Sequence, residues 1–123
     1  MINIIAVFLG GGLGSLARYF MSILLRVYSM DFPFATLAVN MLGCFILGLV
    51  VALFWENTNI HEGFKLALTV GFCGGFTTFS TFSGEVFALI KQGDYMLAFI
   101  YVIISVIICL LATILGAFLA RYV

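Results

Sequence analysis

Among the apolar stretches of this sequence, the one that holds residues 71–85 carries the densest group of polar side chains. Two adjacent glycines, Gly74 and Gly75, precede Thr77 and Thr78 there. Glycine costs about 1 kcal/mol in a helix interior, so this pattern predicts a weakened or broken helix. Inside a membrane, broken backbone is tolerated only where protein buries it or where it lines a watery cavity. Its carbonyls could bind a small cation and its hydroxyls an anion, whereas the alternative is a kink whose hydroxyls bond back to their own helix.

Aromatic and amide side chains offer further contacts to an anion. Phe79 and Phe82 are three residues apart and therefore share a helical face, with Ser80 and Thr81 between them. The positive edge of a phenylalanine ring could contact an anion without trapping it, although two such rings are ordinarily just packing. Asn40 lies within a second apolar stretch. Its amide could join two helices or donate to an anion in a pore.

Two other stretches carry narrow polar or small-residue stripes. One places Tyr101, Ser105, Cys109 and Thr113 at i, i+4 spacing, so that the stripe must face protein or water. In the other, Gly10, Gly14 and Arg18 have the same spacing, which favours tight helix packing. Arg18 cannot face hydrocarbon cheaply, so it snorkels, pairs with a carboxylate or borders an aqueous vestibule.

Composition identifies the elements that must position these residues. Of the 123 residues, 65% are hydrophobic and only 8% are charged, and the mean hydropathy is +1.31. Soluble domains carry roughly 25% charged residues, so this chain is an integral membrane protein. Its apolar stretches predict an all-α membrane domain of four transmembrane helices, with a broken third helix and spans at about 4–25, 33–55, 65–90 and 95–120. Four helices are too few to enclose an aqueous pore alone, so we expect an oligomer.

Charge limits both the topology and the partners. Five basic and five acidic residues give no net charge, and no basic patch indicates nucleic acid. Positive charges near the helix ends are almost evenly divided between the two sides of the membrane. The chain could therefore insert in both directions and form an antiparallel homodimer, or it could have one weakly determined orientation.

Catalysis is not expected. The one histidine, His61, lies in a polar connector, and no nucleophile stands beside a base. The three cysteines, Cys44, Cys73 and Cys109, are widely spaced within apolar runs and lack the spacing of a metal pair. We interpret them as small apolar residues.

Three motifs together indicate a family. They are Gly10-Gly11-Gly12-Leu13-Gly14-Ser15-Leu16-Ala17-Arg18-Tyr19, Thr36-Leu37-Ala38-Val39-Asn40 with Gly43, and Gly74-Gly75-Phe76-Thr77-Thr78-Phe79-Ser80-Thr81-Phe82. With these residues the chain resembles the Fluc (CrcB) family of fluoride channels over essentially its whole length. The TTFSTF core carries the most specific part of the resemblance.

The resemblance implies a dual-topology, antiparallel homodimer in the bacterial cytoplasmic (inner) membrane, with two pores that pass fluoride passively out of the cell. The implied pore contacts are Asn40, Phe79, Ser80, Thr81, Phe82, Tyr101 and Ser105. A central structural sodium ion would be bound by backbone carbonyls of Gly74 and Thr77. Cys109 stands where a serine is expected in some relatives, and a thiol is the weaker donor.

Two other classes of protein compete with this interpretation. A small multidrug transporter also has four helices, but such exporters resemble one another in a buried glutamate of the first helix. The first span here has no acid, and Glu85, the acidic residue of the third span, is the alternative carboxylate. A non-transporting scaffold would explain the glycine stripes but not the amide, phenylalanine and hydroxyl groups.

Overall fold

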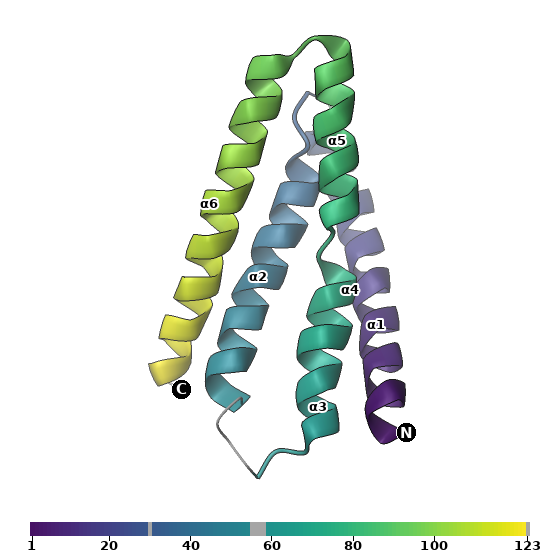
Figure 1. Cartoon of the computed structure of the whole chain (residues 1–123), viewed down its shortest axis with the longest axis vertical. Helices are drawn as coiled ribbons and strands as arrows, with labels where there is room; N and C mark the ends of the chain where they lie inside the picture. The colour runs from purple at the N-terminus through teal and green to yellow at the C-terminus, as the bar shows by residue number, and fades with distance from the viewer. Residues whose placement is uncertain (30, 55–58, 123) are drawn as a thin grey trace.

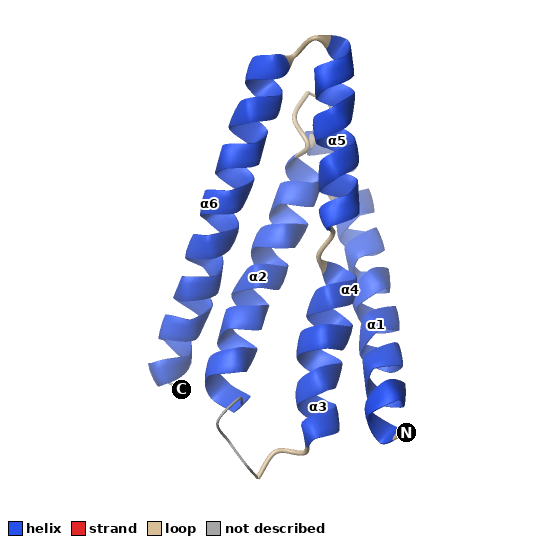
Figure 2. Cartoon of the chain, viewed as in Figure 1, coloured by secondary structure: helices blue, strands red, loops and turns tan. Residues whose placement is uncertain are grey.

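The computed structural model describes residues 1–29, 31–54 and 59–122, and every regular element in this part of the chain is helical (Figures 1 and 2). In chain order the elements are α1 (Ile2–Leu24), η1 (Arg26–Tyr28), α2 (Phe34–Phe54), α3 (Glu62–Leu66), η2 (Ala67–Cys73), α4 (Gly74–Phe76), α5 (Phe79–Gln92), α6 (Tyr95–Leu119) and η3 (Ala120–Tyr122). Together they form four segments that are long and apolar enough to cross a membrane, as the sequence predicts. Both termini lie at one end of the bundle, and the turn from α5 to α6 lies at the other (Figure 1).

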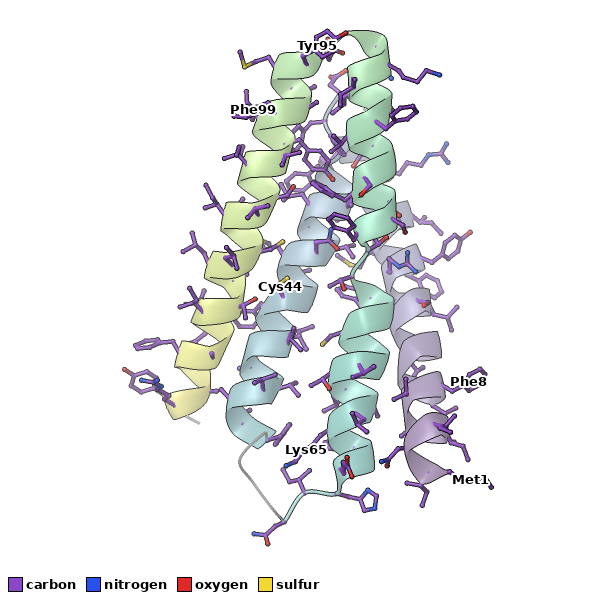
Figure 3. The ribbon with its side chains drawn as sticks, viewed as in Figure 1. Met1, Phe8, Cys44, Lys65, Tyr95 and Phe99 are labelled. Carbon is purple, nitrogen blue, oxygen red and sulfur yellow. The ribbon has the colours of Figure 1, made fainter. Side chains whose placement is uncertain are left out.

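Most large apolar side chains point away from the bundle. Phe8 on α1 and Phe99 on α6 are 76% and 65% exposed, and both extend outward (Figure 3). Among the described residues, the largest side chains that are completely buried, Tyr101 and Val39, lie on α6 and α2. Apolar exposure on this scale suits lipid rather than water as the surrounding solvent.

Glycines set how closely the helices approach one another. A Cβ atom at Gly48 of α2 would overlap the carbonyl oxygen of Thr113 in α6, and one at Gly116 of α6 would overlap that of Phe45 in α2. The backbones of α2 and α6 therefore touch directly. Such contacts lock two helices in register, because neither can slide without a clash.

The same kind of contact joins α1 to the third span. Added Cβ atoms at Gly10 and Gly14 would overlap the carbonyl oxygens of Ala67 and Phe72. The glycine stripe of the first span thus packs against η2, a π-helical segment. Wider π-helical turns are often found at functional positions, and this one ends one short helix, α4, before the break.

The third span is interrupted, but not at its glycine pair. Gly74 is still helical, with φ −64° and ψ −37°, whereas Thr77 (φ −75°, ψ 159°) and Thr78 (φ −150°, ψ 110°) are extended. A Cβ at Gly75 would overlap the carbonyl oxygen of Gly11 in α1. Gly75 therefore permits close packing against α1, and the break comes at the threonines that follow the glycine pair.

A candidate ion pathway around the helix break

The amide of Asn40 in α2 holds the break from the side. Its Oδ1 accepts a hydrogen bond from the backbone N–H of Thr78 at 2.7 Å, and its Nδ2 donates to the Thr78 carbonyl at 3.2 Å. One side chain thus satisfies both backbone groups of a residue that has left the helix, which matters because such groups are costly to bury unpaired. The structure shows the helix-joining role directly, and one of the two Nδ2 hydrogens stays available for another acceptor.

The hydroxyl of Thr78 organises the start of α5. Its Oγ1 accepts from the backbone N–H of Thr81 at 3.2 Å, as an N-cap residue does. The same hydroxyl donates to Thr81 Oγ1 at 3.0 Å and lies 3.3 Å from Ser80 Oγ. The predicted contacts Ser80 and Thr81 therefore belong to a small group of hydroxyls centred on Thr78.

Two backbone carbonyls lose their ordinary helical donors at the break. In an uninterrupted helix the N–H of Thr78 would bond to the Gly74 carbonyl, and that of Thr81 to the Thr77 carbonyl. Here the first N–H bonds to Asn40 and the second to the hydroxyl of Thr78. The carbonyls of Gly74 and Thr77 are thus deprived of those donors.

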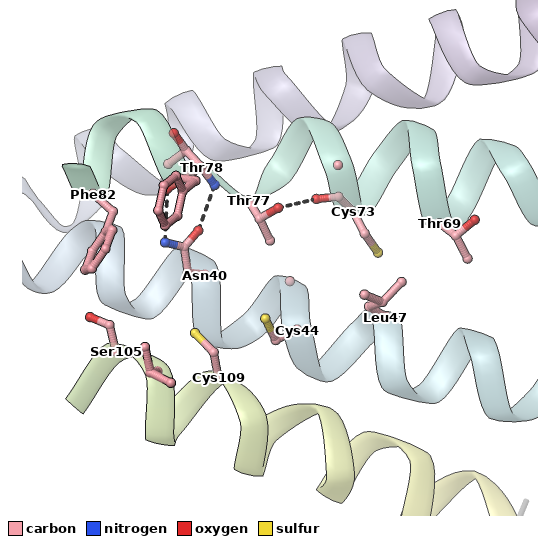
Figure 4. Close-up of a pocket in the computed structure, with 14 residues that line it drawn as sticks. Asn40, Cys44, Leu47, Thr69, Cys73, Thr77, Thr78, Phe82, Ser105 and Cys109 are labelled. Atoms are coloured by element: carbon pink, nitrogen blue, oxygen red, sulfur yellow. Dashed lines mark hydrogen bonds between the residues drawn. The ribbon is translucent and has the colours of Figure 1, made fainter. Parts of the chain in front are cut away.

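A groove beside the break, the main groove, has a volume of about 380 Å³ (Figure 4). Its lining residues come from α2, the interrupted third span and α6: Asn40, Gly43, Cys44, Leu47, Thr69, Cys73, Gly74, Thr77, Thr78, Phe79, Phe82, Ser105, Val106 and Cys109. Every one of these side chains is uncharged. Ser105 Oγ is buried and has no hydrogen-bond partner within the described part of the chain, so it is a donor without an acceptor.

Aromatic rings continue along one side of the main groove. The Phe79 and Phe82 centroids are 5.6 Å apart with the ring planes 42° apart, and Phe82 and Tyr101 are 5.0 Å apart. The two phenylalanines share a helical face as their spacing predicts, but their rings are tilted. Phe79 is 79% exposed, although it is large and apolar. Tyr101, by contrast, is fully buried beneath Phe82.

Glu85 lies in α5, beyond these rings, and its carboxylate has two hydroxyl donors. Tyr101 donates to Oε2 at 2.8 Å and Thr36 donates to Oε1 at 2.7 Å. A carboxylate inside a membrane is costly unless it is bonded, and hydroxyls from two other helices supply those bonds. From the sequence, Glu85 is expected only as the alternative carboxylate of a transporter. An acidic residue within a membrane span is itself an indication of function, because a carboxylate is costly there.

Arg18 lies at a second cavity, the arginine pocket. This cavity of about 220 Å³ is lined by Ser15, Arg18, Tyr19, Ser22, Thr36, Val39, Thr78 and Thr81. The Arg18 guanidinium is partly buried, and its Nε donates to the carbonyl of Gly75 at 3.1 Å. Arg18 thus borders a cavity and also ties α1 to the backbone just before the break, a contact that its position in the sequence does not predict.

The predicted site residues therefore fall into four groups. Asn40, Gly74, Thr77, Phe79, Phe82 and Ser105 line the main groove. Thr81 and Arg18 line the arginine pocket, and Tyr101 is bonded to Glu85. Ser80 lines neither cavity but touches Thr78, which lines both. Thr78 and Thr36 were not among the predicted residues, although the start of a helix after a break calls for a hydroxyl cap such as Thr78.

The fold and these cavities define a class: a small multi-pass helical membrane protein with an uncharged, donor-lined groove at a broken helix. Residues 5–117 match the family model described as CrcB-like protein, Camphor Resistance (CrcB). The chain belongs to this family, which confirms the family assignment made from its motifs.

Curated relatives are similar along nearly the whole chain. The Fluoride-specific ion channel FluC of Pyrococcus abyssi is 46% identical over 92% of this chain and 91% of its own length. The protein of the same name from a Geobacter species is 43% identical over 98% of both chains. Fluoride-specific ion channel FluC 1 of Yersinia pseudotuberculosis is 53% identical over 74% of this chain and 72% of its own. The family is one of ion channels and not of enzymes.

Proposed function

We propose that this chain is a fluoride-selective passive ion channel that exports toxic fluoride from the cytoplasm, acting as one membrane domain in the bacterial cytoplasmic (inner) membrane. The observation that carries the proposal is the uncharged main groove at the helix break. It occurs in a chain whose relatives are named fluoride-specific ion channels. The groove offers a free Nδ2 hydrogen of Asn40, the unpartnered hydroxyl of Ser105 and the ring edges of Phe79 and Phe82. None of these groups carries a charge.

Neutral donors suit the conduction of fluoride. The ion is small and strongly hydrated, so a pathway must replace its water with several well-placed donors. A fixed cation on the pathway would bind it too tightly for rapid release, because conduction needs binding strong enough to enter and weak enough to leave. Arg18 lies close to the break, where it donates to the Gly75 carbonyl, and it lines the other cavity. It supports the break without facing the main groove.

The working unit that we propose is an antiparallel homodimer of dual topology with two pores. The main groove is partly open to the surface of the single chain, and Phe79, one of its lining residues, is 79% exposed. A second copy, inserted in the opposite direction, would close the groove into a pathway and cover this ring. The balance of basic and acidic residues permits both insertions.

A central sodium ion would be a structural part of this dimer. The carbonyls of Gly74 and Thr77 fit such a cation, because the donors that they would have in a continuous helix are bonded elsewhere. Freed backbone carbonyls at broken membrane helices are suitable ligands for sodium. Held by these carbonyls, the ion would fix the break and join the two copies.

Fluoride efflux from liposomes that contain the purified protein tests the channel directly. We expect fast passive fluoride flux with little chloride flux, and strong slowing by Phe79→Ile and by Phe82→Ile. Phe99→Ile is the matched control, because Phe99 points outward from α6 and should leave flux unchanged. Flux no faster than from empty liposomes, or flux that requires a proton gradient, would exclude a passive channel.

Orientation and sodium have their own measurements. Tagged termini should be found on both sides of the membrane, whereas a uniform orientation would exclude the antiparallel dimer. Replacing external and internal sodium with a large organic cation should stop fluoride flux if sodium holds the two breaks together. Unchanged flux after exhaustive removal would argue against a structural sodium ion.

A further inference from the structure

Three thiols, far apart in sequence, point into the main groove. Cys44 comes from α2, Cys73 from η2 and Cys109 from α6, and all three line the cavity (Figure 4). The Cys44 and Cys109 sulfurs lie near each other between α2 and α6, whereas Cys73 reaches the groove from the third span (Figure 4). The sequence spacing gave no sign of this convergence, and the cysteines were interpreted as small apolar residues.

The pairing of Cys44 with Cys109 is fixed by the backbone. Gly48, one turn after Cys44, touches the Thr113 carbonyl, which is one turn after Cys109. A Cβ at Gly48 would clash there, so α2 and α6 cannot move apart or slide without losing a close contact. The two thiols are therefore held opposite each other by a rigid helix pair, which is the preorganisation that a metal site needs.

We propose that Cys44 and Cys109 form a two-coordinate site in the main groove for a soft monovalent d¹⁰ cation, such as Cu(I) or Ag(I). Thiol sulfur selects soft cations of this kind. Binding converts one thiol into a thiolate: two S–H groups and M⁺ give S–M–S(H) and release one proton to water. The product is neutral, which matters because no charged side chain lines the groove to balance a net charge.

Geometry excludes cations that need more ligands. Within the described residues, no group of three or more histidine, cysteine or acidic side chains is arranged to hold a metal ion. Zn(II) normally takes four ligands and is therefore not expected at this pair. An ion that accepts linear coordination by two sulfurs is the one that fits.

The site adjoins the fluoride contacts proposed above. Asn40 lies one turn before Cys44 on α2, and Ser105 lies one turn before Cys109 on α6. A bound cation would occupy the groove beside both donors. The expectation that the cation blocks fluoride flux therefore rests on the proposed channel function. The expectation that the cation binds to the two thiols does not.

Silver binding to the purified full-length chain, measured calorimetrically in chloride-free and fluoride-free micelles, tests the site without reference to conduction. We expect one silver ion per chain and release of about one proton for each ion bound. Cys44→Ser and Cys109→Ser should each weaken binding by about 100-fold or more, since even groups that only support a ligand are worth about 10–100-fold. The double variant should bind silver no more weakly than either single variant. The silver affinity of Cys73→Ser should stay within about twofold of that of the unmodified chain.

Other outcomes would overturn the proposal. If Cys73→Ser weakened silver binding as much as the other two variants, Cys44 and Cys109 would not form a site of their own. If the losses of affinity in Cys44→Ser and Cys109→Ser added up in the double variant, silver would bind to each thiol independently. Binding that survives in the double variant would place silver elsewhere. Helicity of each variant, with Cys→Ala versions at the same positions, separates a lost ligand from a lost fold. In liposomes, we expect silver to block fluoride flux through the unmodified chain but not through Cys44→Ser or Cys109→Ser. The flux of each variant without silver is its reference.

Discussion

Removing the Asn40 side chain should release the break in the third span. In Asn40→Ala the backbone N–H and carbonyl of Thr78 lose their partners, which lie at 2.7 and 3.2 Å. A hydrogen bond contributes about 1 kcal/mol net in proteins, and about 0.6 kcal/mol on average between membrane helices. Thr78 is only 8% exposed, so part of the additional cost of an unpaired buried group, about 1–3 kcal/mol, remains. The sum is a loss of about 2–4 kcal/mol in the free energy of unfolding.

The assay is unfolding of the purified protein in mixed micelles with increasing fractions of a denaturing detergent, followed by helical circular dichroism. Asn40→Asp is informative beside the alanine variant. It keeps an acceptor for the Thr78 N–H but turns a carboxylate oxygen toward the Thr78 carbonyl, so it should restore no stability. Thr113→Val is the control. Among the described residues, the Thr113 hydroxyl bonds only to the Cys109 carbonyl of its own helix, so its loss should cost less than about 0.5 kcal/mol.

A change below about 0.5 kcal/mol in Asn40→Ala would refute the argument that this amide holds the break. Flux measured on the same variants separates the two roles of the amide. Lost flux with unchanged stability would mean that Asn40 acts on the ion, whereas lost stability with lost flux is the outcome that we expect. Unchanged stability and flux together would remove Asn40 from the site.

Two further predictions concern packing and the bonded carboxylate. Gly10→Ala should destabilise the chain by about 1–3 kcal/mol, because the new Cβ overlaps backbone of η2, whereas Gly12→Ala, with nothing within 4 Å, should be neutral or slightly stabilising. Equal effects of the two in the unfolding assay would contradict the packing argument. Glu85→Gln should cost about 1–3 kcal/mol, because an amide offers one acceptor oxygen to the two donors Thr36 and Tyr101. If Glu85→Gln kept its full stability in the detergent titration, the Thr36 or the Tyr101 hydroxyl would have to find another acceptor.

Much of the architecture could be predicted because it follows from composition and periodicity. Apolar stretches separated by short polar connectors predict four membrane helices wherever the chain lies in space. The small-residue stripe of the first span predicts close packing, and Gly10 and Gly14 do meet backbone. The hydroxyl stripe of α6 predicts an inward face, and Tyr101 and Ser105 are buried there.

The position of the break was harder to predict, since glycine has two uses. Its low helix propensity weakens a helix, and its missing Cβ allows another backbone to approach. In this chain the second use explains Gly75, which lies against Gly11 of α1. The extended residues are Thr77 and Thr78, because a partner amide on another helix and a capping hydroxyl are both available there.

The sequence by itself determined the solvent, the number of spans, the family and the kinds of donor available, because each of these depends on which residues occur and at what local spacing. Only the tertiary structure decided which groups share a cavity. It brought Thr36 and Tyr101 to the Glu85 carboxylate and placed Cys44 near Cys109 in the main groove. Partners of this kind lie on different helices, and their distance depends on the crossing and register that backbone contacts at glycines impose. No local pattern in the chain encodes that register.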